Sequence, residues 1–576
     1  MLRKKTKEET SSFLPTCAAE MHARGWDEVD IILVTGDAYV DHPAFGVALI
    51  GRLLEANGFR VAILPQPRHD LPQAFKEFGP PRLFWGITAG NLDSIVANYS
   101  GNAKVRDVDQ YSPNGNPYFG ESRAKNERRR PDRATIRYAN LARNAYGAIP
   151  IILGGLEASL RRFVHYDYQQ GKLRASVLAD AKADLLIYGM GERAVVEVAQ
   201  RLAAGRDLAG IAGTCQRLTD AQLQSFAEEG HVVLPTLAEI EQDREAFLSA
   251  ELLIDKHARA LSRSILVQKQ QAMWVVQHPP AEPLATAEMD SLYGLPFTRR
   301  PHPAAGDVPA YRMISHSVTI VRGCFGNCSF CAISRHQGPV VTSRSEESVL
   351  AEVRRITRMD DFRGTISDLG GPTANLYGSS CRSKTCRRHD CLHEGVCRHL
   401  VMDETPLLSL LDQVSRVDKV KKVFVSSGLR MELLLNTPRL LKKLLTAHTS
   451  GAMKIAPEHT VAHVLRLMHK QGPDVLPAFL ALCRKIAGET GGKFIFTPYF
   501  ISAHPGCTVD DMKALARDVR KMGLSVRQFQ DFTPTPGTIS TAMYVCGLDR
   551  YNRKPIYVAY HAKERMRQRH ILEEMK

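Results

Sequence analysis

The sequence predicts an α/β protein: a doubly wound, Rossmann-like N-terminal domain followed by a partial (β/α)6 barrel. Two observations predict this fold class. Short apolar runs alternate with amphipathic segments in the first half of the chain, and a second series of the same kind begins after a proline-rich stretch. The 576 residues suffice for several domains, and 44% hydrophobic with 24% charged residues is ordinary globular composition.

The N-terminal domain is expected over residues 1–277. Its strands are predicted at residues 30–36, 59–64, 83–88, 149–153 and 184–188, with amphipathic helices at 43–57 and 192–204. Residues 101–134 interrupt this alternation, because they are polar, basic and rich in Gly, Pro and Asn, which predicts a long insertion. Ligands of doubly wound folds bind at the carboxyl ends of the strands.

The barrel is expected over residues 311–546, after a proline-rich linker at 278–310 and before a basic tail at 547–576. Six strands are predicted at residues 315–321, 364–367, 422–426, 452–455, 493–497 and 526–532, with helices at 346–357, 431–445 and 509–522 among the segments between them. Functional residues of such barrels follow the C-terminal ends of the strands.

Charge and hydropathy indicate the compartment and the class of partner. The net charge is +15, and most of the excess lies in residues 121–143, 381–399 and 550–576. Such clustering suits a polyanion such as RNA, although solvated loops and a basic tail would have the same composition. No apolar run approaches the roughly 18 residues of a membrane span, and no apolar segment follows the basic N-terminus, so we expect a cytoplasmic protein without membrane contact.

The strongest motif is formed by Cys324, Cys328 and Cys331, in the pattern C-x3-C-x2-C directly after the first barrel strand. Three thiolates can hold three irons of a 4Fe–4S cube and leave the fourth iron without a protein ligand. Gly323 and Gly326 would let the loop wrap closely around a bulky cluster. The alternatives are a four-cysteine cluster or a zinc site, for which His336 could supply the fourth ligand.

A second cysteine group lies in a Cys-rich insertion at residues 378–400. It consists of Cys381, Cys386, Cys391 and Cys397, with His389, His393 and His399 interleaved. Four thiolates are the standard ligand set of an iron–sulfur cluster and also suffice for structural zinc, so a second cluster or zinc remains open, as do unligated loop cysteines. The insertion has little apolar content, and a metal would therefore supply much of its folding energy.

The first motif resembles the signature of the radical S-adenosylmethionine (radical SAM) superfamily. That resemblance implies that a 4Fe–4S cluster binds S-adenosylmethionine, cleaves it reductively and forms a 5′-deoxyadenosyl radical, with electrons from a flavodoxin- or ferredoxin-type donor. Later strand ends also resemble the superfamily. The resemblance implies that Gly370 and Gly371 hold the methionine amino group, and that Arg430 and Glu458 help to place S-adenosylmethionine.

Longer motifs resemble the YgiQ family over nearly the whole chain: Gly36–Pro43, Arg161–Tyr168, Gly370–Asn375, Lys454–His459 and Asp531–Gly537. This resemblance implies a cofactor and a class of mechanism but no substrate and no catalytic residues. The N-terminal domain resembles a cobalamin-binding domain. We nevertheless expect no bound cobalamin, because the nearest match to Asp-x-His-x-x-Gly, residues 41–46, lacks the spacer before His42.

Two classes of function follow from these patterns. The first is a radical SAM enzyme of unknown substrate, with methyl or methylthio transfer to RNA as one form of it. The second is an RNA-binding protein without catalysis, in which both cysteine groups are structural. The three-cysteine pattern and the ordered strand-end turns favour the enzyme.

Overall fold

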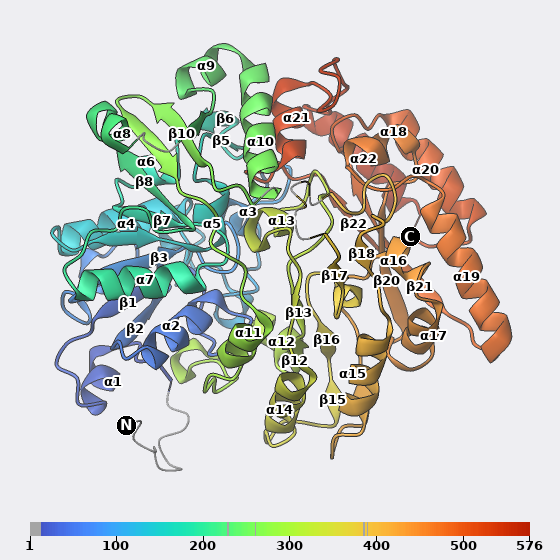
Figure 1. Cartoon of the computed structure of the whole chain (residues 1–576), viewed down its shortest axis with the longest axis horizontal. Helices are drawn as coiled ribbons and strands as arrows, with labels where there is room; N and C mark the ends of the chain where they lie inside the picture. Colours follow the sequence, from blue (N-terminus) through green and yellow to red (C-terminus); the bar gives the residue numbers. More distant parts are fainter. Residues whose placement is uncertain are drawn as a thin grey trace. The chain divides into compact units, whose positions relative to one another are not determined.

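A computed structural model describes residues 13–226, 230–259, 261–383, 386, 388 and 390–575 of the chain. The chain divides into two compact units. The first comprises residues 1–242, 262–282 and 291–315, and the second comprises residues 243–261, 283–290 and 316–576. Figure 1 shows the elements of both units, and the α/β fold class expected from the sequence is confirmed.

The first unit is built on a nine-stranded sheet in the order β2-β1-β3-β4-β7-β8-β11-β10-β9. Strands β2, β1, β3, β4 and β7 run parallel, and every residue of β1 is buried, as a parallel sheet covered on both faces requires. The strands are β1 (Ile31–Thr35), β2 (Val61–Pro65), β3 (Phe84–Thr88), β4 (Ile151–Leu153), β7 (Leu185–Ile187), β8 (Thr214–Leu218), β9 (His231–Val233), β10 (Ile265–Gln270) and β11 (Met273–Gln277).

The five strands predicted for this unit are confirmed, and so are its two predicted helices, α2 (Gly46–Ala56) and α7 (Glu192–Ala203). A further helix, α4 (Ala134–Ala145), packs against β3 and β4. The strands β8, β10 and β11, which pair antiparallel, were not predicted, because buried glutamines interrupt their apolar pattern. Gln268 and Gln270 accept hydrogen bonds from the backbone N–H groups of Val164 (2.9 Å) and Ser176 (2.7 Å).

The expected linker at 278–310 does not form a separate segment. Residues 291–315 belong to the first unit, because Ala305, Val308 and Ala310 are buried in the same apolar cluster as Ile31 and Leu33. Helix α10 (Arg244–Arg259), which the sequence placed in the N-terminal domain, belongs to the second unit.

The second unit contains the expected barrel strands in two parallel groups. In the first group, β12 (Ser317–Thr319) pairs with β16 (Asp368–Gly370), and β15 (Thr365–Ile366) pairs with β19 (Lys422–Val423). In the second group, β20 (Ala452–Glu458), β21 (Ile495–Ser502) and β22 (Gln528–Asp531) form a three-stranded sheet. Besides α10, helices of this unit include α13 (Ile333–Gln337), α14 (Glu346–Ile356), α15 (Thr405–Ser415), α16 (Met431–Leu434), α17 (Pro438–Ala447), α18 (Ala462–Leu467), α19 (Val475–Thr490), α20 (Val509–Lys521), α21 (Ile539–Cys546) and α22 (Ala562–Glu573).

The predicted helix at 431–445 is broken into α16 and α17, because Pro438 cannot continue a preceding helix and instead begins a new one. The expected basic tail is also folded, since α22 packs against α20 and β21. Its buried Gln568 accepts from the N–H of Ala503 at 2.8 Å and donates to the carbonyl of Cys507 at 2.7 Å.

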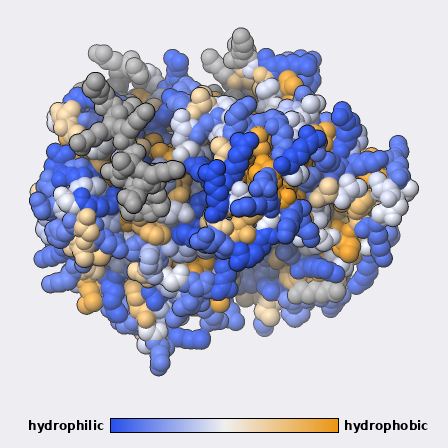
Figure 2. Space-filling model, turned by 90° about the horizontal axis from the view of Figure 1, so that it is seen from below, coloured by the Kyte–Doolittle hydropathy of each residue, from blue (hydrophilic) through white to orange (hydrophobic). Residues whose placement is uncertain are grey.

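One face of the molecule, drawn in Figure 2, carries mostly hydrophilic side chains with scattered hydrophobic ones. Among the described residues, no helix combines the length and the apolar content that a membrane crossing requires.

Candidate functional site

The first cysteine motif forms a loop that begins directly after β13 (Val321–Arg322). Gly323, at φ +80°, turns the chain into this loop, and a side chain there would overlap the carbonyl of Val340. The N–H of Gly326 donates to Cys324 Sγ at 3.4 Å, and the N–H of Ile333 donates to Cys331 Sγ at 3.4 Å. Backbone N–H groups directed at sulfur stabilise a thiolate, so the loop is suited to metal ligation.

Arg430 lies against two of these three thiols. Its Nη2 donates to Cys324 Sγ at 3.6 Å and to Cys328 Sγ at 3.5 Å. Burial raises the pKa of the Cys324 thiol, but Arg430 and the Thr373 hydroxyl outweigh it and leave that pKa below its ordinary value. Burial together with Cys328 raises the pKa of Cys331 to about 12. A side chain at position 326 would overlap the guanidinium of Arg430, so this approach requires glycine.

The predicted glycine turn lies at the end of β16. A side chain on Gly371 would overlap the carbonyl of Val321, and one on Gly370 would overlap the hydroxyl of Ser427. Asp368 fixes the neighbouring strand end, because its Oδ1 accepts from the N–H groups of Ser426 (2.8 Å) and Ser427 (3.1 Å). The ends of β13, β16 and β19 are therefore held side by side.

Near this turn region Glu458 is buried and Arg430 is half-buried, and each carries an enclosed polar atom without a hydrogen-bond partner among the described residues. These atoms are Arg430 Nε and Glu458 Oε2. Arg430 is fixed by Asn375, whose Oδ1 accepts its N–H at 3.0 Å, and by Glu432 at 2.8 Å. Burial raises the pKa of Glu458, while Lys470 and Arg430 act in the opposite direction.

The backbone of Glu458 holds φ +66°, a left-handed conformation that costs of order 1 kcal/mol for a non-glycine residue. Such strain at the end of a barrel strand is typical of functional positions. An unpartnered guanidinium nitrogen and an unpartnered carboxylate oxygen fit a zwitterionic ligand that carries both a carboxylate and an ammonium group.

Two buried histidines near the strand ends have structural partners. His459 Nδ1 accepts from the N–H of Val461 at 3.0 Å, and its Nε2 lies 3.5 Å from Cys507 Sγ. His504 Nε2 lies 2.7 Å from the hydroxyl of Ser540. Burial lowers the pKa of each histidine to about 3, so both are neutral at physiological pH.

The second cysteine group is folded onto the barrel. Cys391 is buried, Cys386 and Cys397 are half-buried, and Cys381 is exposed. Burial raises the pKa of Cys391 to about 12, and charge on Cys397, Cys386 and Cys381 acts in the same direction, so all four thiols lie within electrostatic reach. His389 lies outside the described residues. Across the described ranges, no three His, Cys, Asp or Glu side chains meet the geometry of a single metal-ion site.

The basic stretches predicted to face a polyanion carry both exposed and buried cations. Arg128 and Arg130 are buried, and Arg130 pairs with Asp37 at 2.7 Å and with Asp109 at 3.1 Å. Arg550 is buried as well, and its Nη1 donates to the hydroxyl of Ser329 at 2.7 Å.

Comparison with known proteins identifies the class. The family model described as Radical SAM N-terminal matches residues 13–317, which is more than half of the chain. The chain is therefore a radical SAM protein. Within that class it belongs to the UPF0313 family, because it is 46% identical to the UPF0313 protein of Geobacter sulfurreducens over 97% of this chain and 92% of that protein.

A UPF0313 protein of Methanocella arvoryzae is 44% identical over 96% of this chain and 92% of its own length. Among solved structures, the radical SAM methyltransferase TsrM from Kitasatospora setae, with cobalamin and a [4Fe–4S] cluster bound, is 16% identical. The match covers 88% of this chain and 76% of that chain, with a TM-score of 0.49.

Proposed function

We propose that this protein is a radical SAM enzyme that cleaves S-adenosylmethionine reductively, with a 4Fe–4S cluster held by Cys324, Cys328 and Cys331. The observation that carries the proposal is the cysteine loop beside Arg430 and Glu458, which combines three sulfur donors with two buried, unpartnered charged atoms. When bound, the cluster would supply the electron that breaks the carbon–sulfur bond. The test is production of 5′-deoxyadenosine by anaerobically reconstituted protein given S-adenosylmethionine and dithionite.

The chain's own residues would bind and orient the cosubstrate. Arg430 Nε would donate to the methionyl carboxylate, and Glu458 Oε2 would accept from the methionyl ammonium group. Gly370 and Gly371 let the turn pack closely against Ser427 and Val321, and their backbone would lie beside the ligand. We infer that a cytoplasmic donor of the flavodoxin or ferredoxin type supplies the electron, and that the family is the one named YgiQ.

We propose that the first unit does not bind cobalamin. Ligands of such sheets bind at the carboxyl ends of the strands. In this unit the insertion at residues 101–134 lies at the carboxyl ends of β1 and β3. Arg130 reaches into this region to pair with Asp37, and side chains at Gly36 or Gly90 would approach its guanidinium. His42 is buried and its Nδ1 accepts from the N–H of Ala44 at 3.1 Å. Corrinoid absorbance retained on gel filtration after incubation with cobalamin would contradict this proposal.

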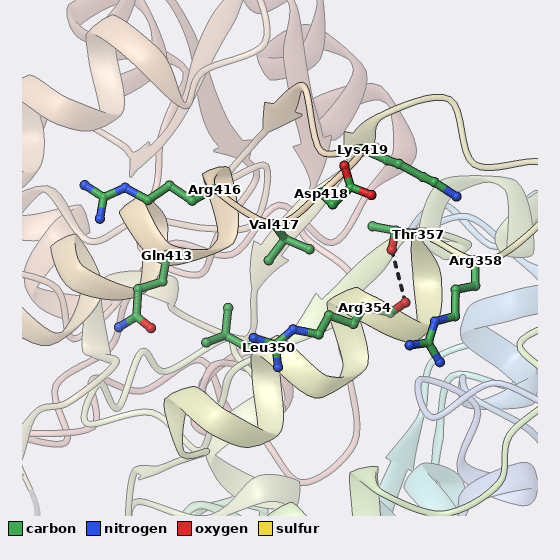
Figure 3. A pocket seen from close by; sticks show the side chains of 9 residues that line it. All are labelled: Leu350, Arg354, Thr357, Arg358, Gln413, Arg416, Val417, Asp418 and Lys419. Carbon is green, nitrogen blue, oxygen red and sulfur yellow. Dashed lines mark hydrogen bonds between the residues drawn. The ribbon is translucent and has the colours of Figure 1, made fainter.

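RNA is the second candidate partner, and a basic pocket favours it. The pocket, of about 580 Å³, lies where α14 and α15 end, and Figure 3 shows Arg354, Arg358, Arg416 and Lys419 around it, with the acidic Asp418 beside them. All four cationic side chains belong to exposed residues. The pocket lies at the N-terminal ends of β15 and β19, opposite the strand ends that carry the cysteine loop. A phosphate backbone would suit this charge.

We expect Arg358→Glu/Arg416→Glu to weaken RNA binding and to lower the slope of log affinity against log salt by about one for each phosphate that the protein no longer neutralises. The matched control is Arg484→Glu/Lys485→Glu, which changes the charge equally at two exposed positions of α19. Filter binding at several salt concentrations measures both. Equal affinity of the two variants would exclude the pocket as the RNA site.

A further inference from the structure

Backbone pairing brings together the two ends of the Cys-rich insertion and three of its cysteines. Strand β17 (Ser380–Cys381) pairs antiparallel with β18 (Leu400–Val401), which places Cys381 opposite Leu400. The N–H of Cys397 donates to the carbonyl of Cys391 at 2.8 Å and closes a short loop, in which Gly395 holds φ +126°. The two ends of the insertion and its central loop therefore meet.

The loop between Cys391 and Cys397 is seated on the barrel core. Cys391 and Leu392 are buried in the large apolar cluster of this unit, and Val396 and Cys397 pack against it. Cys381 and Cys386 are more accessible. Two of the four thiols thus have positions fixed by the barrel, and the other two are more exposed.

Polar contacts anchor the same segment from outside the core. The carboxylate of Asp390 lies 2.9 Å from His469 Nε2, and His469 Nδ1 lies 2.6 Å from the hydroxyl of Tyr551. The ring of His393 stacks on that of His469 with centroids 3.7 Å apart. Residues on both sides of Cys391 are therefore held in one orientation by groups of the barrel.

A further set of polar contacts connects this segment to the first cysteine loop. Arg259 pairs with Asp255 at 2.9 Å and donates to the carbonyl of Arg388 at 3.0 Å. Asp255 in turn accepts from the side chain of Asn327, which lies between Cys324 and Cys328, at 3.4 Å. A chain of polar contacts thus links the two cysteine groups within the second unit.

We propose that Cys381, Cys386, Cys391 and Cys397 bind a second iron–sulfur cluster. Four cysteines, of which one pair is fixed on the core, are the ligand set of such a cluster, whereas a single zinc ion needs a compact site that the described residues do not form. Apart from the loop seated on the core, the insertion is polar and basic, so a metal would provide much of the energy that keeps Cys381 and Cys386 in place. The proposal does not depend on cleavage of S-adenosylmethionine.

The test counts iron, sulfide and zinc in the full chain purified anaerobically. A Cys324→Ala/Cys328→Ala/Cys331→Ala variant removes the first site, and we expect it to retain about four irons with sulfide and visible absorbance. Retention of iron and sulfide supports the second cluster, whereas about one zinc without iron would overturn it. If this variant contains no metal, the proposal is wrong.

A second variant, Cys381→Ser/Cys386→Ser, alters the two more accessible thiols, so the core under Cys391 is left intact. We expect it to lose the second metal while the iron of the first site stays. Cys546→Ser, a half-buried thiol of α21 outside both groups, is the control and should keep the wild-type metal content. Unchanged metal content in the Cys381/Cys386 variant would contradict the assignment of these ligands.

Discussion

Replacing Cys328 by alanine is expected to abolish reductive cleavage of S-adenosylmethionine. Three thiolates are the minimal protein ligand set for this kind of cluster, so two remaining cysteines would not retain it. Iron content should fall by about four per chain, and 5′-deoxyadenosine should fall to the level of protein that was never reconstituted. Anaerobic reconstitution followed by iron analysis and product chromatography measures both quantities on one sample.

Cys483→Ala is the matched control for this experiment. Cys483 is a buried thiol of α19 and belongs to neither cysteine group, so its replacement removes a similar volume without removing a ligand. We expect wild-type iron content and product formation. Cleavage by the Cys328 variant at the rate of this control would show that the loop does not hold the catalytic cluster.

The core of this site was predictable because its chemistry is encoded in local spacing. Cys324, Cys328 and Cys331 lie within eight residues, and Gly370 and Gly371 follow a recognisable strand. The contributions of Asn375 and Lys470 could not be predicted. Asn375 contacts Arg430 from a segment distant in sequence, and Lys470 reaches Glu458 only because the chain folds back after α18. The strained backbone of Glu458 also has no signal in the sequence.

Composition alone does not show which cations folding buries. In the basic stretch at 121–143, Arg130 is enclosed and neutralised by Asp37 and Asp109, whereas Arg123 is exposed. The basic pocket between α14 and α15 arises instead from residues about sixty positions apart, such as Arg358 and Arg416, which only the fold brings together. Charge counts along a chain do not reveal which cations face solvent.

The second large effect is expected at Glu458. Glu458→Gln keeps the size of the side chain but removes its negative charge, so a methionyl ammonium group would lose its charged partner. Removing one partner of a buried charge pair costs about 2–5 kcal/mol, which corresponds to roughly 30-fold to several-thousand-fold weaker binding. We expect the affinity for S-adenosylmethionine to fall by at least the lower value, while the cluster remains, because no contact joins Glu458 to the three sulfurs among the described residues.

Arg430→Lys separates ligand binding from support of the cluster. Lysine retains the positive charge but lacks the guanidinium nitrogens that donate to Cys324 and Cys328, so this variant should lose iron as well as affinity for S-adenosylmethionine.

Glu489→Gln, at an exposed residue that pairs with Lys442, is the control for charge removal at Glu458 and should leave iron content and affinity unchanged. Calorimetric titration of reconstituted protein with S-adenosylmethionine, alongside iron analysis, distinguishes the cases. If Glu458→Gln bound the cosubstrate as tightly as Glu489→Gln does, the ammonium group would have to be held elsewhere, and the glycine turn at Gly370 and Gly371 would be left as its site.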